Sequence, residues 1–596
     1  MRFRPLAPVG AALFAALLLG SHAATAQVAM TVPHPPADVV NGDAAGSVNG
    51  EAASFGDETA GADEISGEIA VDLRDDASDA DVDALDKKLG IVMHPSSTWS
   101  IAHDRLEVAD VDPGREAAVL DALSHDPLVE HAEPMAIYRA TFVPDDPLYA
   151  SKQWHLKRVG AESAWNYTCG RGVTVAVIDT GVACFDKGPF SRGTDLSGTR
   201  CEGGWNFVDD NAQAADDQGH GTHVAGTIAQ TTNNAVGTAG LAYCATLMPI
   251  KVLSRQGFGS TANVAEGIRF AADNGAQIIN LSLGGPIKSK ILEDAVNHAI
   301  AKNVLVVAAA GNSGRSVGWP AAYPGVVAVS ATDVNDKIAA FSSRGPQVVL
   351  AAPGVAVTQQ TICNGGREKC EIFGTFSGTS MASPHVAGVA AMIEGLGVTD
   401  AGALRDVLTS TARPKGERSL YGAGIVDVGA AASHVFYTDL ALRAVALLGL
   451  GWVVGRRIRK RGGLMARTPA SVAGAIMAGV GLVPIAPLLG LGRYATLAMR
   501  PLGEWDLVLF GAGVHQWLLL ASALPAVALT LFAFASKRVR PLIGGVALGT
   551  AALLVQHLVS GDVAFVGGPM LAKVWMVANA LVCLWLARTA LDQKKV

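Results

Sequence analysis

The first periodic stretch of hydrophobic and polar positions lies between residues 68 and 140. Alternation over residues 69–73 predicts a strand, and helical spacing over residues 79–89 predicts a helix. Further expected elements are a strand at 106–108, a helix at 115–123 and a strand at 135–138. Two strand–helix units in a segment of this length favour a small α+β domain of ferredoxin-like build.

From about residue 154 to 433, short apolar runs alternate with helical stretches. The runs are residues 173–178, 247–253, 278–283 and 304–309. Strands that are apolar on both sides are typical of a sheet covered by helices on both faces. We therefore expect a mostly parallel, doubly wound α/β domain over residues 141–433.

After residue 433 the chain is apolar in blocks. Five candidate membrane spans are residues 436–455, 471–492, 514–535, 541–559 and 570–587. Blocks of about 20 apolar residues are long enough to cross a bilayer, although buried core helices are the alternative. We expect an all-α transmembrane region over residues 434–596 with about five helices.

Basic residues follow the first, third and fifth of these blocks. They are Arg456, Arg457, Arg459, Lys460 and Arg461, then Lys537, Arg538 and Arg540, and finally Arg588, Lys594 and Lys595. All of them fall on the cytoplasmic side if the preceding domains lie outside the cytoplasm, as the positive-inside rule requires. The pattern predicts an extracytoplasmic amino-terminal part and a cytoplasmic carboxyl terminus.

The amino terminus has the pattern of an export signal. Arg2 and Arg4 precede an apolar stretch over residues 6–20, and Ala24-Thr25-Ala26 offers a small-residue cleavage site. The stretch is short for a membrane anchor, which needs about 20 residues. We expect residues 1–26 to be a signal peptide and the acidic residues 27–67, which are poor in aromatics, to be a disordered linker.

Composition supports this division. Half of the residues are hydrophobic, 17% are charged and the mean hydropathy is +0.31, which is high for a protein without a membrane part. The net charge of −7 argues against nucleic-acid binding. Six of the 7 cysteines lie in the central region, and without a CxxC pair they favour disulfides in an exported protein over a metal site.

Three segments of the central region carry candidate chemistry. Asp179 ends an apolar run, His220 stands in Gly-His-Gly-Thr-His, and Ser380 stands in Gly-Thr-Ser-Met-Ala-Ser-Pro, where Pro384 suits the first turn of a helix. A serine hydroxyl becomes nucleophilic when a neighbouring histidine takes its proton, and a carboxylate fixes the histidine tautomer. Because ligands bind beyond the carboxyl ends of strands in such a sheet, the three side chains can converge there.

In this order and context the segments resemble the subtilase family, over about residues 147–432. The resemblance implies that Asp179 is the orienting acid, His220 the general base and then acid, and Ser380 the nucleophile. Asn312, in Ala-Ala-Ala-Gly-Asn, resembles the family's oxyanion donor, beside the Ser380 backbone N–H. Residues 68–140 resemble the family's inhibitory propeptide by size, pattern and position.

The resemblance also implies how substrate binds. Family members pair an extended peptide with two edge segments, which match Gly257-Phe258-Gly259 and Ser282-Leu283-Gly284 here. Gly318 matches a position that lines the primary specificity pocket. We see no acidic residue at the matching positions, so an apolar or broad preference is expected rather than a preference for Lys or Arg.

No cofactor is expected for the chemistry, but a structural calcium ion is implied by the resemblance. Residues 232–238 resemble a calcium loop of the family, with Asn234 as a side-chain ligand and Asp195 as a carboxylate. A loop rich in Asn and Gly that binds no ion is the alternative.

Three disulfides are expected among the central cysteines. Cys363 and Cys370 flank a short loop that contains Asn-Gly-Gly. In the resembled fold, Cys169 and Cys244 precede neighbouring strands, which leaves Cys184 to pair with Cys201.

The sequence thus predicts a membrane-anchored, autoprocessed serine endopeptidase on the extracytoplasmic side of a bacterial inner or plasma membrane. Its expected partners are protein or peptide substrates, its own propeptide as inhibitor, and the lipid bilayer. A transporter or receptor with a peptide-binding, protease-like domain and an inactive protease scaffold are the alternatives. Intact triad and oxyanion residues disfavour both.

Overall fold

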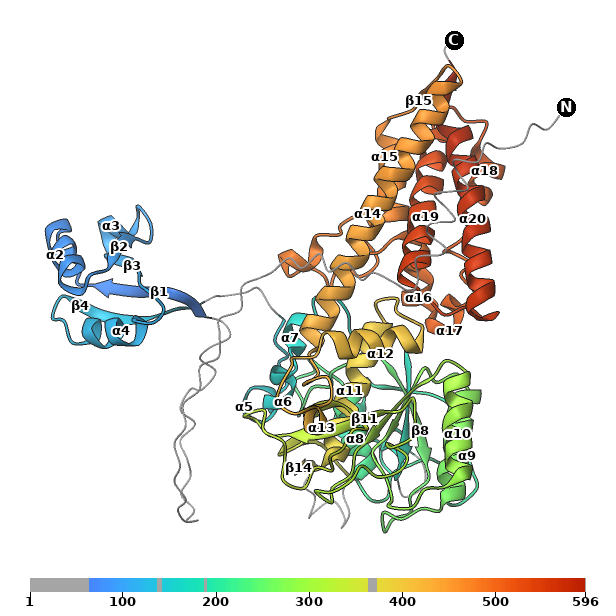
Figure 1. The fold of residues 1–596 in the computed structure, drawn as a ribbon, viewed down its shortest axis with the longest axis horizontal. Helices are drawn as coiled ribbons and strands as arrows, with labels where there is room; N and C mark the ends of the chain where they lie inside the picture. The colour runs from blue at the N-terminus through green and yellow to red at the C-terminus, as the bar shows by residue number, and fades with distance from the viewer. Residues whose placement is uncertain (1–63, 137–141, 187–189, 363–371, 595–596) are drawn as a thin grey trace. The chain divides into compact units, whose positions relative to one another are not determined.

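A computed structural model describes residues 64–136, 142–186, 190–362 and 372–594 (Figure 1). These residues form two compact units, one on either side of residue 140. The expected signal peptide, most of the acidic linker and the expected Cys363–Cys370 pair lie outside the described residues.

The first unit is a four-stranded antiparallel sheet with strand order β2-β3-β1-β4. Its elements are β1 Glu64–Leu73, α2 Asp79–Leu89, β2 Val92–Pro95, α3 Ser100–His103, β3 Leu106–Asp110, α4 Glu116–Ser124 and β4 Val129–Ala136. β1 begins before the expected boundary at residue 68 because Glu64 still pairs with Ala136 of β4. β4 likewise begins before the expected 135.

Alternation along β1 builds the core of this unit. Ile69, Val71 and Leu73 are fully buried and pack with apolar residues of α2 and α4, such as Leu85 and Leu123. Residues with a period of two point to one face of a strand, so one face of the sheet carries both helices. Ser78 caps α2 by accepting a hydrogen bond from the Asp81 backbone N–H.

The second unit contains an eight-stranded sheet whose strands, within the described residues, all pair in parallel. The order is β12-β11-β10-β9-β5-β8-β6, and β7 also pairs with β8. The strands are β5 Thr174–Asp179, β6 Arg200–Cys201, β7 Trp205–Asn206, β8 Thr246–Lys251, β9 Ile278–Leu281, β10 Leu305–Ala309, β11 Val327–Thr332 and β12 Val348–Pro353. This is the doubly wound α/β sheet that the apolar runs predict.

Helices cover both faces of this sheet (Figure 1). On one face lie α8 His220–Ala229 and α11 Thr379–Glu394, and on the other lie α9 Thr261–Asp273 and α10 Lys290–Ala301. β5 contributes Val175 and Val177 to the first core and Ala176 and Ile178 to the second. A strand buried on both sides has no position for a polar residue, which explains its continuous apolar run.

The remaining elements of this part are short helices and a hairpin. They are α5 Tyr149–Lys152, α6 Trp154–Arg158, α7 Ala161–Ala164, η1 Thr194–Leu196, α12 Ala401–Ser410, α13 Arg418–Tyr421 and the hairpin of β13 Val357–Gln360 with β14 Phe373–Phe376.

Beyond residue 427 the chain is mainly helical. The elements are α14 Val428–Lys460, α15 Pro469–Gly479, η2 Ala486–Leu489, η3 Leu502–Glu504, α16 Trp505–Phe510, α17 Ala512–His515, α18 Leu524–Ala533, α19 Arg540–Ser560 and α20 Gly568–Leu591. A short antiparallel pair, β15 Gly463–Met465 with β16 Asp592–Lys594, joins the ends of α14 and α20.

In the described part of the chain, three helices and not five are long and apolar enough to cross a membrane: α14, α19 and α20. The second and third expected blocks contain the shorter apolar helices α15 and α18 instead. Helix α15 ends at Gly479, ahead of Pro484 and Pro487, which cannot continue a helix. The third block has no regular helix over residues 516–523, and its helix α18 has only 10 residues.

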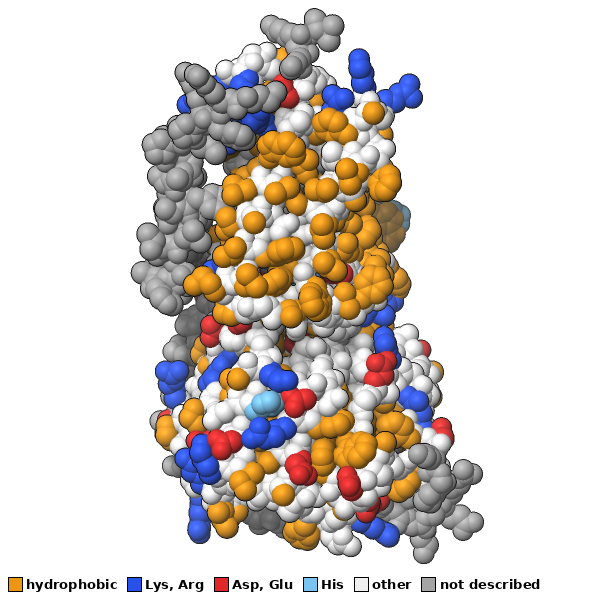
Figure 2. Space-filling view, turned by 90° about the vertical axis from the view of Figure 1, so that its right-hand side faces the viewer, with side chains coloured by type: hydrophobic (Ala, Val, Ile, Leu, Met, Phe, Trp, Pro, Cys, Tyr) orange, Lys and Arg blue, Asp and Glu red, His pale blue; other side chains and the backbone are white. Residues whose placement is uncertain are grey.

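The outer surface of these helices is apolar. Figure 2 shows hydrophobic side chains gathered over the C-terminal helices, whereas charged side chains are scattered over the α/β part. Large apolar residues such as Leu531, Phe532 and Met570 are exposed there. Contiguous apolar surface of this extent marks a membrane or protein interaction site.

Candidate active site

Asp179 lies at the carboxyl end of β5 and is fully buried. Its Oδ1 accepts hydrogen bonds from His220 Nδ1 at 2.7 Å and from the Thr180 backbone N–H at 2.7 Å. A carboxylate on Nδ1 leaves Nε2 of the imidazole as the nitrogen that can accept a proton. The strand end thus fixes both the position and the tautomer of the histidine.

His220 is the first residue of α8. The chain turns sharply into this helix, since Gly219 has φ 106° and a Cβ on Gly221 would overlap the Gly181 carbonyl. The imidazole remains 26% exposed, which leaves its other edge open to the surface. Burial alone lowers the pKa of His220, but the Asp179 carboxylate outweighs that effect and raises the pKa above its usual 6.5.

A second carboxylate, which the sequence analysis missed, supports this turn. Asp216 is buried and accepts hydrogen bonds from the Thr180 hydroxyl and the Gly219 N–H, both at 2.9 Å, and from the hydroxyl of Thr222 at 2.6 Å. These bonds connect the end of β5 to the start of α8. The signal in the sequence is an acidic residue just before the Gly-His-Gly motif.

Ser380 is the second residue of α11, where the backbone N–H has no partner within the helix. Its hydroxyl donates to the Ser282 carbonyl at 3.1 Å, and its carbonyl accepts from the Ser282 hydroxyl at 2.8 Å. Pro384 lies in the second turn of α11, and not in the first as expected. Because proline lacks the N–H that would bond to the Ser380 carbonyl, that carbonyl is free for Ser282.

Asn312 follows β10 and lies beside the start of α11. Its Oδ1 accepts from the backbone N–H of Thr379 at 2.8 Å and from the Thr379 hydroxyl at 3.0 Å. A backbone N–H can only donate, so these bonds fix the orientation of the amide and leave Nδ2 as its donor. Thr379, directly before Ser380, is a positioning residue that the sequence analysis did not single out.

The expected substrate segments border one cleft of about 500 Å³ that also contains His220. Gly257, Phe258 and Gly259 form one side, and Ser282, Leu283 and Gly284 form the other. Gly318 lies behind this lining: its N–H donates to the Ala310 carbonyl, and its neighbour Trp319 exchanges two backbone hydrogen bonds with Gly285. The structure therefore brings the expected binding segments to the edge of the histidine.

Residues 170–424 match the subtilase family, and residues 497–596 match a domain of unknown function, DUF5942. The chain is 38% identical over 335 residues to a thermophilic serine proteinase of Bacillus sp. AK1, covering 56% of this chain and 79% of that protein. It is 40% identical to thermitase of Thermoactinomyces vulgaris (46% of this chain, 92% of thermitase). It is 43% identical to subtilisin Savinase of Lederbergia lenta (47% and 98%).

The chain belongs to the subtilase family. It is a serine endopeptidase, and its parallel sheet with helices on both faces is the subtilisin-like α/β fold.

In this subtilase the residues of the expected calcium loop come together. Asp195, which is fully buried, contacts the Asn234 side chain at 2.8 Å and accepts from the Thr238 N–H at 2.9 Å. Burial raises the pKa of Asp195 to about 6. Asp146, which the sequence analysis did not single out, bonds the Asn233 N–H through Oδ2, while its buried Oδ1 has no partner.

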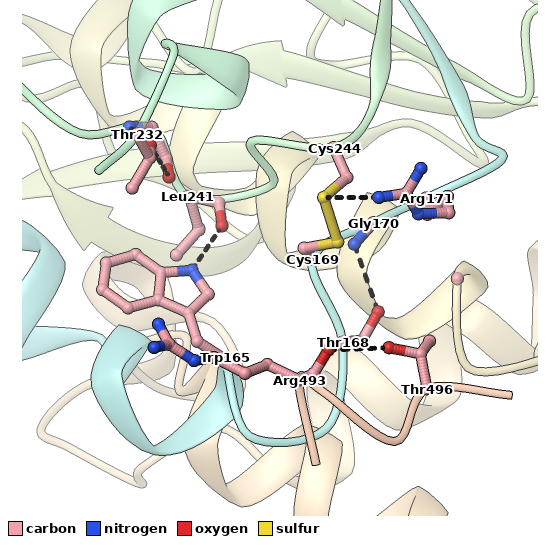
Figure 3. Close-up of a disulfide and its surroundings, with 12 residues drawn as sticks. Trp165, Thr168, Cys169, Gly170, Arg171, Thr232, Leu241, Cys244, Arg493 and Thr496 are labelled. Atoms are coloured by element: carbon pink, nitrogen blue, oxygen red, sulfur yellow. Dashed lines mark hydrogen bonds between the residues drawn. A yellow bond between two sulfur atoms is a disulfide. The ribbon is translucent and has the colours of Figure 1, made fainter. Parts of the chain in front are cut away.

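Two disulfides link cysteines of the subtilase domain, in the pairs that were expected: Cys169–Cys244 and Cys184–Cys201. The first ties the segments that lead into β5 and β8 (Figure 3). Cys583 is a free, buried thiol in α20.

Proposed function

We propose that Asp179, His220 and Ser380 are the catalytic triad of a membrane-anchored, autoprocessed serine endopeptidase. The observation that carries this proposal is the 2.7 Å bond between Asp179 and His220, in a cleft whose Ser282 is bonded to Ser380. A buried acid, an oriented imidazole and a helix-terminal hydroxyl are the parts that acyl transfer needs.

The reaction begins when the Ser380 hydroxyl turns from the Ser282 carbonyl to His220 Nε2. The imidazole takes the proton while Oγ attacks the scissile carbonyl carbon, and Asp179 stabilises the imidazolium. Asn312 Nδ2 and the Ser380 backbone N–H donate to the oxyanion of the tetrahedral intermediate. His220 then protonates the leaving amine, which departs and leaves an acyl-enzyme. A water molecule attacks the acyl carbon while His220 takes its proton, and His220 returns this proton to the Ser380 oxygen as the acyl group is released.

Substrate specificity follows from the lining of the cleft. Among its residues His220 is the only titratable one, and Leu253, Val264 and Leu292 add apolar surface. A Lys or Arg side chain would lose its water there without gaining a carboxylate partner. We therefore expect broad or apolar preference, with the peptide pairing along residues 257–259 and 282–284.

The proposal is tested by hydrolysis of a denatured protein substrate with the full chain and with Ser380→Ala. The wild type should degrade the substrate, and the variant should not. Equal degradation by both would remove Ser380 from the mechanism. Binding of peptides without hydrolysis by wild type would favour the alternative of a peptide-binding domain.

We also propose a structural calcium ion at Asp195 and Asn234, with Asp146 as a further ligand. Two buried carboxylates beside a loop of backbone carbonyls fit a hard cation, and the unpartnered Asp146 Oδ1 would gain a ligand. No cluster of three acidic, His or Cys side chains occurs in the described ranges, so carbonyl oxygens must complete the site. The ion has no part in the chemistry.

The first unit is proposed to be the inhibitory propeptide. Its element order, with β1-α2-β2 followed by β3-α4-β4, and its antiparallel sheet support a ferredoxin-like build. Cleavage is expected between residues 138 and 152, in the proline-punctuated linker. N-terminal sequencing of membrane-bound enzyme should find this end, whereas Ser380→Ala should keep the precursor; an active enzyme that starts near residue 27 would contradict autoprocessing.

Membrane anchoring by α14, α19 and α20 completes the proposal. The basic ends of the long helices α14 and α20 and the basic start of α19 lie on one side, so the expected orientation is retained. The protease would lie in the periplasm or outside the cell, and the carboxyl terminus in the cytoplasm. In right-side-out vesicles, external protease should leave a tag after residue 596 intact. Loss of the tag would show that the carboxyl terminus lies on the outer side.

A further inference from the structure

The protease part of the second unit contacts the C-terminal helices through direct backbone bonds. The Thr399 N–H donates to the Asp562 carbonyl at 2.8 Å, and the Ala512 N–H donates to the Gly172 carbonyl at 2.8 Å. Arg500 donates to the Gly395 carbonyl at the end of α11. Gly492 passes so close to Asn166 that a Cβ there would overlap its carbonyl, and Figure 3 shows the Arg493–Thr496 segment near the Cys169–Cys244 disulfide.

A buried ionic network fills the space behind these contacts. Arg443 of α14 bonds Glu504 and, at 3.0 Å, Gln556 of α19, and it lies 3.4 Å from Asp439. Gln556 in turn donates to Asp562 at 2.9 Å. The side chains of Arg443 and Glu504 are only 8% and 2% exposed. A charge cluster that is buried on all sides holds its elements in one arrangement, because separating them strands a charge in apolar surroundings.

This network marks the outer end of the proposed spans. Helices α14 and α19 pack antiparallel, since Arg443 meets Gln556 and Gly451 faces Leu548. By that register Asp439 is level with Ser560, the last residue of α19. Asp562, which bonds Thr399, follows at once. The protease part therefore sits directly on the outer ends of the helices, with no spacer between them.

The contacts and the active site lie at opposite ends of the same elements. Gly172 precedes β5, which ends at Asp179, and Gly395 follows α11, which begins beside Ser380. The seven residue steps from Gly172 to Asp179, most of them within β5, span at most about 23 Å. Fifteen helical residues from Gly395 to Ser380 span about 22 Å. Both lengths separate the cleft from the membrane-side contacts by about 20 Å.

We propose that the C-terminal region is a rigid mount that holds the cleft about 20 Å outside the membrane, so that the substrates are soluble polypeptides and long extracytoplasmic stalks or loops, and not juxtamembrane segments. This inference rests on the proposed membrane anchoring and peptidase activity. A stalk needs about 6 extended residues to rise 20 Å, and about 4 more to pair along the cleft. Cleavage of membrane-tethered substrates should therefore require at least about 10 residues between membrane and scissile bond.

The test uses the full wild-type chain in phosphatidylethanolamine–phosphatidylglycerol vesicles. Single-span substrate proteins carry one identical cleavable sequence at the end of stalks of about 4, 8, 16 and 32 residues, at about 3.3 Å per residue. The same sequence as a free peptide measures the peptidase activity by itself. Vesicles with Ser380→Ala give the background at every length.

The mount predicts that the initial rate falls at least tenfold between the 16- and 4-residue stalks, while the free peptide and the 32-residue stalk are cleaved readily. Equal rates on the 4- and 32-residue stalks would overturn it. So would cleavage of the free peptide with no stalk cut at any length. If the free peptide itself is not hydrolysed, the proposed peptidase activity is wrong, and the distance proposal that rests on it is wrong with it.

Discussion

Two of the buried networks of charge among the described residues serve different purposes. At the cleft, Asp179 holds a histidine whose other edge is still exposed and can exchange a proton. At the membrane side, Arg443, Glu504, Asp439 and Gln556 bond mainly to one another and bury nearly all of their surface. The first network leaves the exposed edge of the histidine available to a substrate. The members of the second network bond mainly to one another instead.

The comparison shows that a buried carboxylate can serve reactivity in one place and rigidity in another. A carboxylate beside His220 changes what its partner does with a proton, so its loss should appear in kinetics. A carboxylate beside Arg443 changes only what it costs to separate helices, so its loss should appear in stability. Substitutions in the two networks should therefore separate the two readouts.

The largest effect is expected for Ser380→Ala or His220→Ala. Each should lower kcat by about 10⁶-fold, the size measured for the same roles in subtilisin, or about 8 kcal/mol in barrier. Because the residues act as a unit, the double variant should lose little more than either single one. Peptide hydrolysis rates, compared with thermal inactivation curves for the same variants, check this prediction. A near-normal rate from either single variant would show that the substituted residue is not part of the triad.

The second effect concerns the membrane-side network. Glu504→Leu leaves the Arg443 guanidinium short of its nearest carboxylate and should destabilise the region by about 3–5 kcal/mol. The matched double variant Glu504→Leu with Arg443→Met removes both charges and should recover much of that loss. Thermal inactivation in vesicles measures the stability, and kcat for a free peptide should remain within twofold of the wild-type value. A large fall in kcat would show that this network also affects the chemistry.

Asn312→Ala should come next, with kcat lower by about 10²–10³, as for the oxyanion asparagine of subtilisin. KM should change little, because the amide serves the transition state. Thr379→Val keeps the shape of the side chain and removes the hydroxyl that donates to Asn312 Oδ1 and accepts from the Gly311 N–H, so about a tenfold loss is expected. A kcat for Asn312→Ala within a few-fold of wild type would exclude it as a donor.

The smallest effect concerns the proposed calcium site. Burial raises the pKa of Asp195 from 3.8 to about 6, so without a cation the folded protein loses stability as the pH rises from about 4 to about 6. The loss, at most about 3 kcal/mol, is then complete above pH 6. EDTA should lower the inactivation temperature more at pH 8 than at pH 5, with Asp195→Asn as the less sensitive control; an equal shift at both values would argue against the site.

The sequence predicted the active-site network better than the membrane-side one because the proposed catalytic residues sit in local motifs. A strand end, a Gly-His-Gly turn and a Gly-Thr-Ser helix start each fix one side chain within a few residues. Thr379 and Asp216 escaped notice because their contacts, with Asn312 and with Thr180, join segments far apart in the chain.

The C-terminal region shows the limit of reading hydropathy alone. Residues 471–492 and 514–535 are apolar enough to resemble spans, yet α15 ends at Gly479, ahead of Pro484, and α18 begins only at Leu524. Asp439 and Arg443, which seem out of place in an apolar block, find partners in η3 and α19 that no local pattern reveals. This buried network follows from packing between distant segments.

The central claim is that Ser380 is the nucleophile served by His220 and Asp179. Its most direct test is to label full-length enzyme in membranes with a fluorophosphonate and to map the adduct by mass spectrometry. The account predicts a single adduct on the peptide that contains Ser380, absent in Ser380→Ala and strongly reduced in His220→Ala. An adduct on another residue, or undiminished labelling of Ser380→Ala, would contradict it.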